Sequence, residues 1–257
     1  MDLSVNTFKA AIAKGRQQIG LWCSIGDPLT CEMLAGCGFD WMLIDTEHTT
    51  LNPQDVVPIL QAMAPYPTHP IVRPSSLDAA EIKKLLDAGA QSILVPYVQT
   101  VAEAHAAAAA VAYPPDGIRG VAGITRATRF GAVEGYHGRA RGEICLIVQI
   151  ETGQALDNIE KIAGVPGIDA LFIGPADLAA SLGYPGEPSH PKVKSACIDG
   201  IRRIRAAGKP AGFLTLDQDF LAEIVDAGSI FTAVDVDAAI LRKGALERAR
   251  TWRARTG

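Results

Sequence analysis

The stretch ALFIGPADLAASLG, residues 170–183, contains the unit that decides the fold of this chain. It begins with a continuous apolar run, passes through Gly-Pro-Ala, presents Asp177, and continues into the helix-like sequence LAASLG. A short continuous apolar run is typical of a strand buried on both faces of a parallel sheet. The stretch therefore predicts a buried strand that ends in an acid and is followed by a helix.

The same alternation of strand and helix recurs along the whole chain. Apolar runs predict strands within 19–26, 41–48, 69–76, 91–98, 144–152, 169–177, 209–217 and 229–237. Helix-like segments lie at 28–37, 53–64, 78–88, 101–112, 154–163, 191–207, 218–227 and 238–254. Several of these segments end at glycine, as helices commonly do. The pattern predicts a single-domain TIM (β/α)8 barrel over residues 1–257. The alternative is an open doubly wound sheet, but no GxGxxG sequence follows any of the strands.

One long segment, residues 113–140, interrupts this alternation and is predicted to be irregular. Loops of this length in a compact domain are usually functional or disordered. One hypothesis is that Arg126 and Arg129 in this segment attract a distal carboxylate of a substrate. The alternative is that they are solvated surface arginines, because long charged side chains are mostly exposed.

Composition excludes several classes of partner. The net charge of -4 and the pI near 5.7 give no electrostatic reason to expect binding to nucleic acid or to an anionic membrane. The five cysteines form no CxxC pair, a usage typical of a reducing compartment. The N-terminal sequence has no apolar signal core, and no apolar run is long enough to span a bilayer. We therefore expect a soluble, cytoplasmic protein.

Polar residues at the ends of the predicted strands are the candidates for an active site, because TIM-barrel enzymes carry their sites at the carboxyl ends of the strands. The candidates are Asp45, Glu47 and His48 after the second strand, Arg73 after the third, Gln149 and Glu151 after the fifth, and Asp177 after the sixth.

Glu151 and Asp177 lie one strand–helix repeat apart, so adjacent strands would place the two carboxylates side by side. Two carboxylates without a nearby cysteine or second histidine favour a hard divalent ion such as Mg²⁺, Mn²⁺ or Co²⁺ over tetrahedral zinc. Such an ion could bind a 2-oxo acid and stabilise an enolate as a Lewis acid. The alternatives are that Asp177 caps a helix and that Glu151 pairs with a lysine.

His48 and Arg73 are the candidates for proton transfer and charge stabilisation. His48 follows two acids, Asp45 and Glu47, that could orient or charge it. Arg73 is either a structural ion-pair partner or a stabiliser of oxyanion charge. No lysine lies at the end of a strand, as a Schiff-base aldolase would require, so the sequence favours metal-dependent chemistry.

Six motifs, in order, resemble the HpcH/HpaI aldolase family of class II, metal-dependent pyruvate aldolases. They are GFDWMLIDTEH, PIVRPSS, GAQSILVPYVQT, YPPDGIRGV, VQIET and FIGPADLAASLGY, and the resemblance spans roughly residues 19–215. It implies an enzyme that reversibly cleaves a 4-hydroxy-2-oxo acid into an aldehyde and pyruvate, or a related 2-oxo acid such as hydroxypyruvate. The enzymatic alternative is a CoA-ester lyase of the citrate or malyl type, although no evident basic surface suits the phosphates of CoA. A non-catalytic barrel that acts as a binding protein is the third possibility.

The resemblance also implies roles for individual residues. Glu151 and Asp177 would be the metal ligands, and Gln149 would lie beside the metal. The backbone amides of Ala176 and Asp177 would hold the carboxylate of pyruvate. Arg73 would bind the keto or enolate oxygen, and His48 would transfer protons. Each role is carried over by position in the quoted motifs.

Assembly is implied in the same way. An aspartate corresponding to Asp87 would support His48 from across a subunit boundary, although Asp45 lies nearer to His48 in sequence. We expect a homohexamer built as a trimer of dimers, with the last helix exchanged between subunits. One departure from the family pattern is Thr46 with Thr49-Thr50, where many relatives carry Gly or Met and then a turn with proline. We expect this change to lie beside the substrate mouth.

Overall fold

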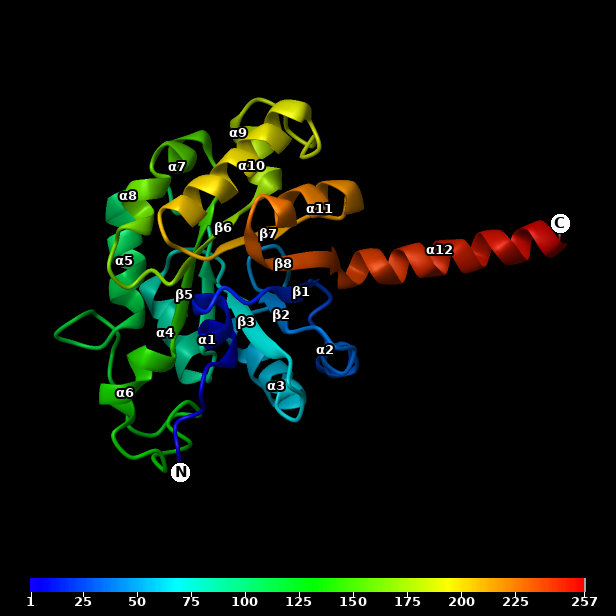
Figure 1. Ribbon diagram of the computed structural model, residues 1–257. Coiled ribbons are helices and arrows are strands. Elements are labelled where there is room, and N and C mark those ends of the chain that lie inside the picture. The colour runs from blue at the N-terminus through cyan, green and yellow to red at the C-terminus, as the bar shows by residue number, and fades with distance from the viewer. Residues whose placement is uncertain (257) are drawn as a thin grey trace.

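Eight parallel strands pair in sequence order and close into a barrel, because β8 also pairs with β1 (Figure 1). The strands are β1 (Gln18–Cys23), β2 (Trp41–Asp45), β3 (His69–Arg73), β4 (Ser92–Val95), β5 (Cys145–Ile150), β6 (Ala170–Ile173), β7 (Ala211–Leu214) and β8 (Ser229–Val236). The structure is a computed structural model and describes residues 1–256. The prediction of a TIM barrel with eight strands is confirmed.

Alternate residues of the strands face two different cores. On β2, Trp41 and Leu43 belong to the cluster inside the barrel, whereas Met42 and Ile44 pack in the cluster between the strands and the helices. Both sets are fully buried, which explains why the strands are continuous apolar runs in the sequence. Gly20 on β1 makes room for the Trp41 ring, because a Cβ atom at residue 20 would overlap that ring.

Helices form the outer layer of the barrel (Figure 1). They are α1 (Thr7–Ala13), α2 (Pro28–Ala35), α3 (Pro53–Met63), α4 (Ala79–Asp87), α5 (Val101–Val111), α6 (Tyr136–Glu143), α7 (Gly153–Asp157), α8 (Ile159–Ala163), α9 (Pro175–Ser181), α10 (Pro191–Ala206), α11 (Gln218–Asp226) and α12 (Asp237–Thr256). The helix expected at 154–163 is divided into α7 and α8 at Asn158, whose backbone leaves the helical region.

Helices α1 and α6 have no counterpart among the predicted helices, and α9 begins earlier than the helix-like sequence expected after Asp177. Helix α1 places Phe8 and Ile12 in the cluster inside the barrel, where Phe8 stacks on His69 of β3. Because His69 is the first residue of its strand, α1 covers the amino end of the barrel. Helix α9 follows β6 directly, with Pro175 as its first residue. It therefore holds Asp177 in its first turn rather than in a loop.

The segment 113–140 is irregular over a shorter length than we predicted. Helix α6 begins at Tyr136, and Tyr136 and Ala140, one turn apart, are both buried. The preceding Gly135 has a left-handed backbone (φ 64°), which turns the chain into the helix. Earlier in the segment, Arg119 is buried against the ring of Tyr113. Buried anchors thus hold this segment against the barrel.

The last helix, α12, leaves the barrel and projects away from it (Figure 1). Its first residue, Asp237, is buried, and its carboxylate accepts hydrogen bonds from the backbone amides of Ser24 and Ile25 and from the Ser24 hydroxyl, at 2.9–3.1 Å. Leu241 and Trp252, farther along α12, are exposed. Within residues 1–256, no helix is both long and apolar enough to cross a membrane.

Candidate active site

A cavity of about 440 Å³ opens at the carboxyl ends of the strands. Its lining residues lie on, or in the segments after, every strand except β4. None of these lining residues is a lysine. Six of the predicted site residues line it: Asp45, His48, Arg73, Gln149, Ala176 and Asp177. Glu151 lies beneath the surface of the cavity, 2% exposed. The structure therefore brings seven of the eight predicted residues to one end of the barrel.

Arg73, the last residue of β3, is held in place by two acids that lie on, or directly after, the neighbouring strand β2. Its Nε and Nη2 atoms donate to the two carboxylate oxygens of Asp45, at 2.9 and 2.6 Å. Its Nη1 lies 2.7 Å from Oε2 of Glu47. A guanidinium has five N–H groups, so three remain on Nη1 and Nη2 for Glu47 and for a molecule in the cavity. The side chain is almost fully buried, so its position is fixed before any ligand binds.

The two acids that hold Arg73 respond differently to their surroundings. Burial raises the pKa of Asp45, but the hydrogen bonds and charge of Arg73 outweigh it, and the pKa of that carboxyl is lowered overall. For Glu47, burial is again the largest effect and raises the pKa; the charges of Arg73 and His48 oppose this, and those of Asp45 and Asp177 add to it. The pKa of Glu47 is raised overall. The lowered pKa favours the ionised form of Asp45, which is thus the anionic partner of Arg73.

His48 is exposed and lies at the rim of the cavity. Its Nε2 atom is 3.9 Å from a carboxylate oxygen of Glu47. Asp45 does not contact the ring, since its Oδ1 accepts from the backbone amides of Glu47, at 3.0 Å, and His48, at 3.4 Å. Asp45 therefore orders the backbone that carries His48, and its side chain is directed to Arg73.

Glu151 is a buried carboxylate that lacks a cationic partner. Its Oε1 accepts a hydrogen bond of 2.7 Å from the backbone amide of Tyr97, and its Oε2 accepts one from the side chain of Gln149. Burial is the largest effect on Glu151 and the charges of Glu47 and Asp177 add to it, whereas the Tyr97 amide and the charge of Arg73 oppose it; the pKa is raised to about 7. Within residues 1–256, neither Glu151 nor Asp177 belongs to an ion pair.

These donors fit a hard cation. Glu151 is buried and Asp177 is half-buried. A positive charge between the two carboxylates would offset their repulsion, and oxygen ligands suit Mg²⁺, Mn²⁺ and Co²⁺. The side-chain oxygen of Gln149 is also buried and has no hydrogen-bond partner. The described residues hold no cluster of three or more His, Cys, Asp and Glu side chains that could bind a metal. The protein thus offers two carboxylates, and further ligands would have to come from outside it.

The first turn of α9 adds a second binding element. The helical hydrogen bonds of α9 start at the amide of Leu178, which donates to the carbonyl of Gly174 at 3.2 Å. The amides of Ala176 and Asp177 precede it and have no partner within the helix, as is usual for a first turn. Free amides at this place can hold a carboxylate.

Three residues of the site were missed by the sequence analysis. The ring of Trp22 on β1 lies against Arg73, with the guanidinium carbon 4.7 Å from its centroid. Tyr97 has a left-handed backbone (φ 57°), a rare conformation for a non-glycine residue, and this geometry accompanies the amide hydrogen bond to Glu151. Gly174 lies so close that a Cβ atom there would be 2.5 Å from Oε2 of Glu151. Only Gly174 had a sequence signal, a glycine between a buried strand and an acid.

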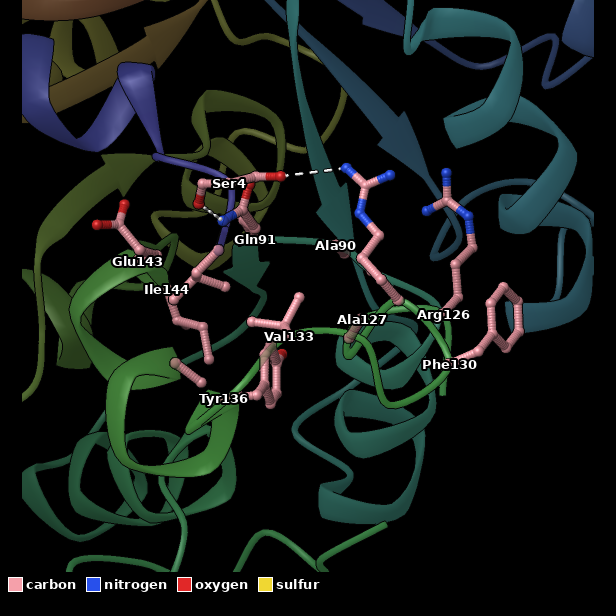
Figure 2. A pocket seen from close by; sticks show the side chains of 14 residues that line it. Ser4, Ala90, Gln91, Arg126, Ala127, Phe130, Val133, Tyr136, Glu143 and Ile144 are labelled. Carbon is pink, nitrogen blue, oxygen red and sulfur yellow. Dashed lines mark hydrogen bonds between the residues drawn. The ribbon is translucent and has the colours of Figure 1, made fainter. Parts of the chain in front are cut away.

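Asp87, Arg126 and Arg129 lie elsewhere in the same chain. Asp87 ends α4, at the amino end of the barrel, and pairs with Arg119 at 2.8 Å. Arg126 donates to the carbonyl of Ala88. Figure 2 shows Arg126 beside a separate cavity of about 170 Å³, which is also lined by Arg129. Within one chain, none of these three side chains can reach the cavity that contains His48.

Thr46 and Thr49-Thr50 are chain neighbours of Asp45 and His48, which line the cavity, but the hydroxyls of Thr46 and Thr49 bond to the backbone. Thr46 is buried, and its hydroxyl donates to the carbonyl of Arg73 at 2.6 Å. The hydroxyl of Thr49 donates to the carbonyl of Asp45 at 2.6 Å. These threonines fix the ends of β2 and β3, because each ties a hydroxyl to a strand-end carbonyl, and none of the three lines the cavity.

A closed barrel with an acid-rich cavity at the carboxyl ends of its strands defines an enzyme-type TIM barrel. Residues 18–243 match the model of the HpcH/HpaI aldolase/citrate lyase family. The chain is 55% identical to a hydroxypyruvate/pyruvate aldolase of Sagittula stellata, over 98% of this chain and 100% of that protein. It is 48% identical to a 4-hydroxy-2-oxo-heptane-1,7-dioate aldolase of Shigella sonnei, over 93% of this chain and 92% of that one.

A solved structure agrees with this relationship. The crystal structure of an HpcH/HpaI aldolase/citrate lyase family protein from Burkholderia cenocepacia superposes with a TM-score of 0.93 at 35% identity. The superposition covers 97% of this chain and 100% of that chain. This protein belongs to the HpcH/HpaI aldolase/citrate lyase family.

The close contact at Gly174 generates a first prediction. Gly174→Ala should lower kcat/KM by roughly 100-fold, because the new methyl group displaces the ends of Glu151 and Gln149, and small displacements in a site are costly. The fold should survive, since the two closest atoms are the ends of side chains and the Cβ of Glu151, at 3.1 Å, needs to move only slightly. Steady-state kinetics and thermal melting test this. Gly142→Ala, whose methyl group would meet nothing within 4 Å, is the matched control. Unchanged kinetics in Gly174→Ala would contradict the prediction.

The buried carboxylate of Glu151 generates a second prediction. In the unfolded chain the Glu151 carboxyl group loses its proton near pH 4.5, whereas in the folded metal-free protein it keeps the proton until about pH 7. Protonated Glu151 therefore stabilises the fold fully below pH 4.5, and this contribution falls by about 3 kcal/mol as the pH rises to 7.

Thermal melts of the metal-free wild type and of Glu151→Gln between pH 4.5 and 8 measure the contribution of the Glu151 proton to stability. The difference between the two proteins should grow with pH. Added Mn²⁺ should raise the melting temperature of the wild type at pH 8, and not that of Glu151→Gln, because the ion binds only the folded protein with the intact acid. Parallel pH profiles would contradict this account of Glu151.

Proposed function

We propose that this protein is a divalent-metal-dependent aldolase, a carbon–carbon lyase that reversibly cleaves 4-hydroxy-2-oxo acids. The products are an aldehyde and pyruvate, or a related 2-oxo acid such as hydroxypyruvate. Relatives with 48% and 55% identity are named aldolases, which favours this activity over a CoA-ester lyase or a non-catalytic barrel. The observation that carries the proposal is the buried Glu151 carboxylate, which belongs to no ion pair within residues 1–256 and lies near the acids Glu47 and Asp177.

Glu151 and Asp177 are the proposed metal ligands, with Gln149 holding Glu151 in place. The ion is Mg²⁺, Mn²⁺ or Co²⁺, and when bound it supplies Lewis-acid stabilisation of negative charge on the substrate. The free amides of Ala176 and Asp177 bind the carboxylate of the 2-oxo acid. The remaining N–H groups of Arg73 bind the oxygen on C2.

Cleavage requires the C4 hydroxyl to lose a proton as the C3–C4 bond breaks. We assign His48 as the residue that takes up this proton, because an imidazole changes charge near neutral pH. The electrons of the broken bond form an enolate, whose oxygen is stabilised by the charge of Arg73. Return of a proton to C3 then gives the methyl group of pyruvate.

The proposed assembly is a homohexamer, a trimer of dimers with α12 exchanged between subunits. Exposed apolar side chains on the projecting α12, among them Leu241 and Trp252, support an oligomer. In this assembly Asp87 of one subunit supports His48 of the next, since the two lie at opposite ends of one barrel. Arg126 and Arg129 could reach a neighbour's substrate in the same way. The proposed location is the cytoplasm, which suits five free cysteines.

Removal of the ion tests the proposed chemistry. Dialysis against EDTA should lower pyruvate release from a 4-hydroxy-2-oxo acid at least about 100-fold, because without the ion only Arg73 is left to stabilise the enolate. Added Mn²⁺ or Mg²⁺ should restore it. Pyruvate is followed with NADH and lactate dehydrogenase, and circular dichroism controls for unfolding. Full activity after chelation would refute metal dependence.

Mixed oligomers test the role of Asp87 across a subunit boundary. His48→Ala and Asp87→Asn should each be nearly inactive alone. Co-expressed in equal amounts, they should recover about one quarter of wild-type activity, because random pairing reunites an intact His48 with an intact Asp87 in that share of sites. A mixture that stays inactive would contradict the assignment.

A further inference from the structure

Trp22 occupies a place between the barrel core and the active-site cavity. It lies near the end of β1, is 5% exposed, and lines the cavity beside Arg73. On its inner side its ring packs, tilted, against Phe172 of β6, with ring centroids 5.7 Å apart. A core residue in this place needs only an apolar side chain, yet the chain has a tryptophan with a polar N–H.

The N–H group of Trp22 is used within the site. Its Nε1 atom donates to Oδ2 of Asp45 at 3.1 Å, and this oxygen also accepts the Nη2 hydrogen bond of Arg73. The flat face of the same ring lies under the guanidinium of Arg73 at 4.7 Å. Trp22 thus contacts both members of the ion pair, one through a hydrogen bond and the other through a cation–π contact.

The geometry points to Trp22 as a positioning residue for Arg73. The hydrogen bond fixes the plane of the Asp45 carboxylate, and the ring face fixes the plane of the guanidinium. The two planes together set the direction of the free N–H groups of Arg73. This inference rests on the proposed function in one respect, because Arg73 is there assigned to bind the oxygen on C2 of the substrate.

The contacts can be removed one at a time. Trp22→Phe keeps an aromatic face under Arg73 and loses the N–H group, whereas Trp22→Leu loses both. We expect kcat for cleavage to fall roughly three- to tenfold in Trp22→Phe and about 10- to 100-fold in Trp22→Leu. KM should change less than about threefold, because the lost stabilisation is specific to the developing charge.

Trp41→Phe is the matched control. Trp41 is also buried inside the barrel and also donates one hydrogen bond, from Nε1 to the carbonyl of Gln18 at 3.3 Å. It lies at the amino end of β2, far from the cavity. The same substitution there should lower thermal stability and leave kcat unchanged. An equal loss of kcat in Trp41→Phe would show that the Trp22 effect is a general loss of core packing.

A double-mutant cycle asks whether Trp22 acts through Arg73. Arg73→Lys keeps a charge but cannot make the paired hydrogen bonds to Asp45. In that background, Trp22→Phe should lower the residual kcat less than about twofold, since there is no guanidinium left to orient. The same three- to tenfold loss in both backgrounds would overturn the inference.

Crystal structures give a readout that does not depend on activity. In Trp22→Leu, the guanidinium of Arg73 should leave the plane of the Asp45 carboxylate, and in Trp41→Phe it should stay. An unmoved Arg73 in Trp22→Leu would overturn the inference even if the wild type proved to cleave no 4-hydroxy-2-oxo acid. A wild type without cleavage would instead refute the proposed function and leave the structural test of Trp22 intact.

Discussion

The chemistry of the pocket depends on how its one buried guanidinium is shared. Asp45 and Glu47 both form ion pairs with Arg73, and both lie on or directly after the strand next to it. Glu151 and Asp177, on the other side of the cavity, are left without a positive partner. A buried carboxylate without an ion-pair partner is costly, and a bound cation beside Glu151 would offset that cost. The ion pair at Arg73 and the proposed metal site are therefore two results of one distribution of charge.

The barrel register makes this distribution possible. Asp45 and Arg73 are direct partners in the pairing of β2 with β3, which brings their side chains together without any loop. On β5 and β6, Gln149 pairs with Phe172 and Ile150 pairs with Ile173, so the next residues, Glu151 and Gly174, leave the barrel together. A side chain at residue 174 would then collide with the Glu151 carboxylate. The closed sheet thus determines which side chains meet at its rim. Loop residues such as Tyr97, whose amide binds Glu151, complete the site.

The sequence predicted the strands and the location of the site well, because both depend on local patterns. Continuous apolar runs identify strands buried on both faces, and polar residues at their ends identify the rim. Helix α1 was missed although it carries local signals, with Asn6 as its N-cap and Phe8, Ala11 and Ile12 at the spacing of one helical face. The partners of Asp45 and the contacts of Trp22 were missed because a sequence does not show where a side chain points. The left-handed backbone of Tyr97 is likewise imposed by its surroundings.

The buried carboxylate of Asp237 gives the last helix a mechanical connection to the pocket. Asp237 begins α12 and accepts three hydrogen bonds from Ser24 and Ile25, and Ser24 lines the cavity. A displacement of α12 would therefore reach the rim of the cavity by two routes, through Asp237 to Ser24 and through Val236, the preceding residue of β8. The N-terminus, held by a hydrogen bond from Met1 to the carbonyl of Ala132, has no such connection. A fusion partner joined to the C-terminal end of α12 is therefore expected to disturb the cavity through Asp237 and Val236.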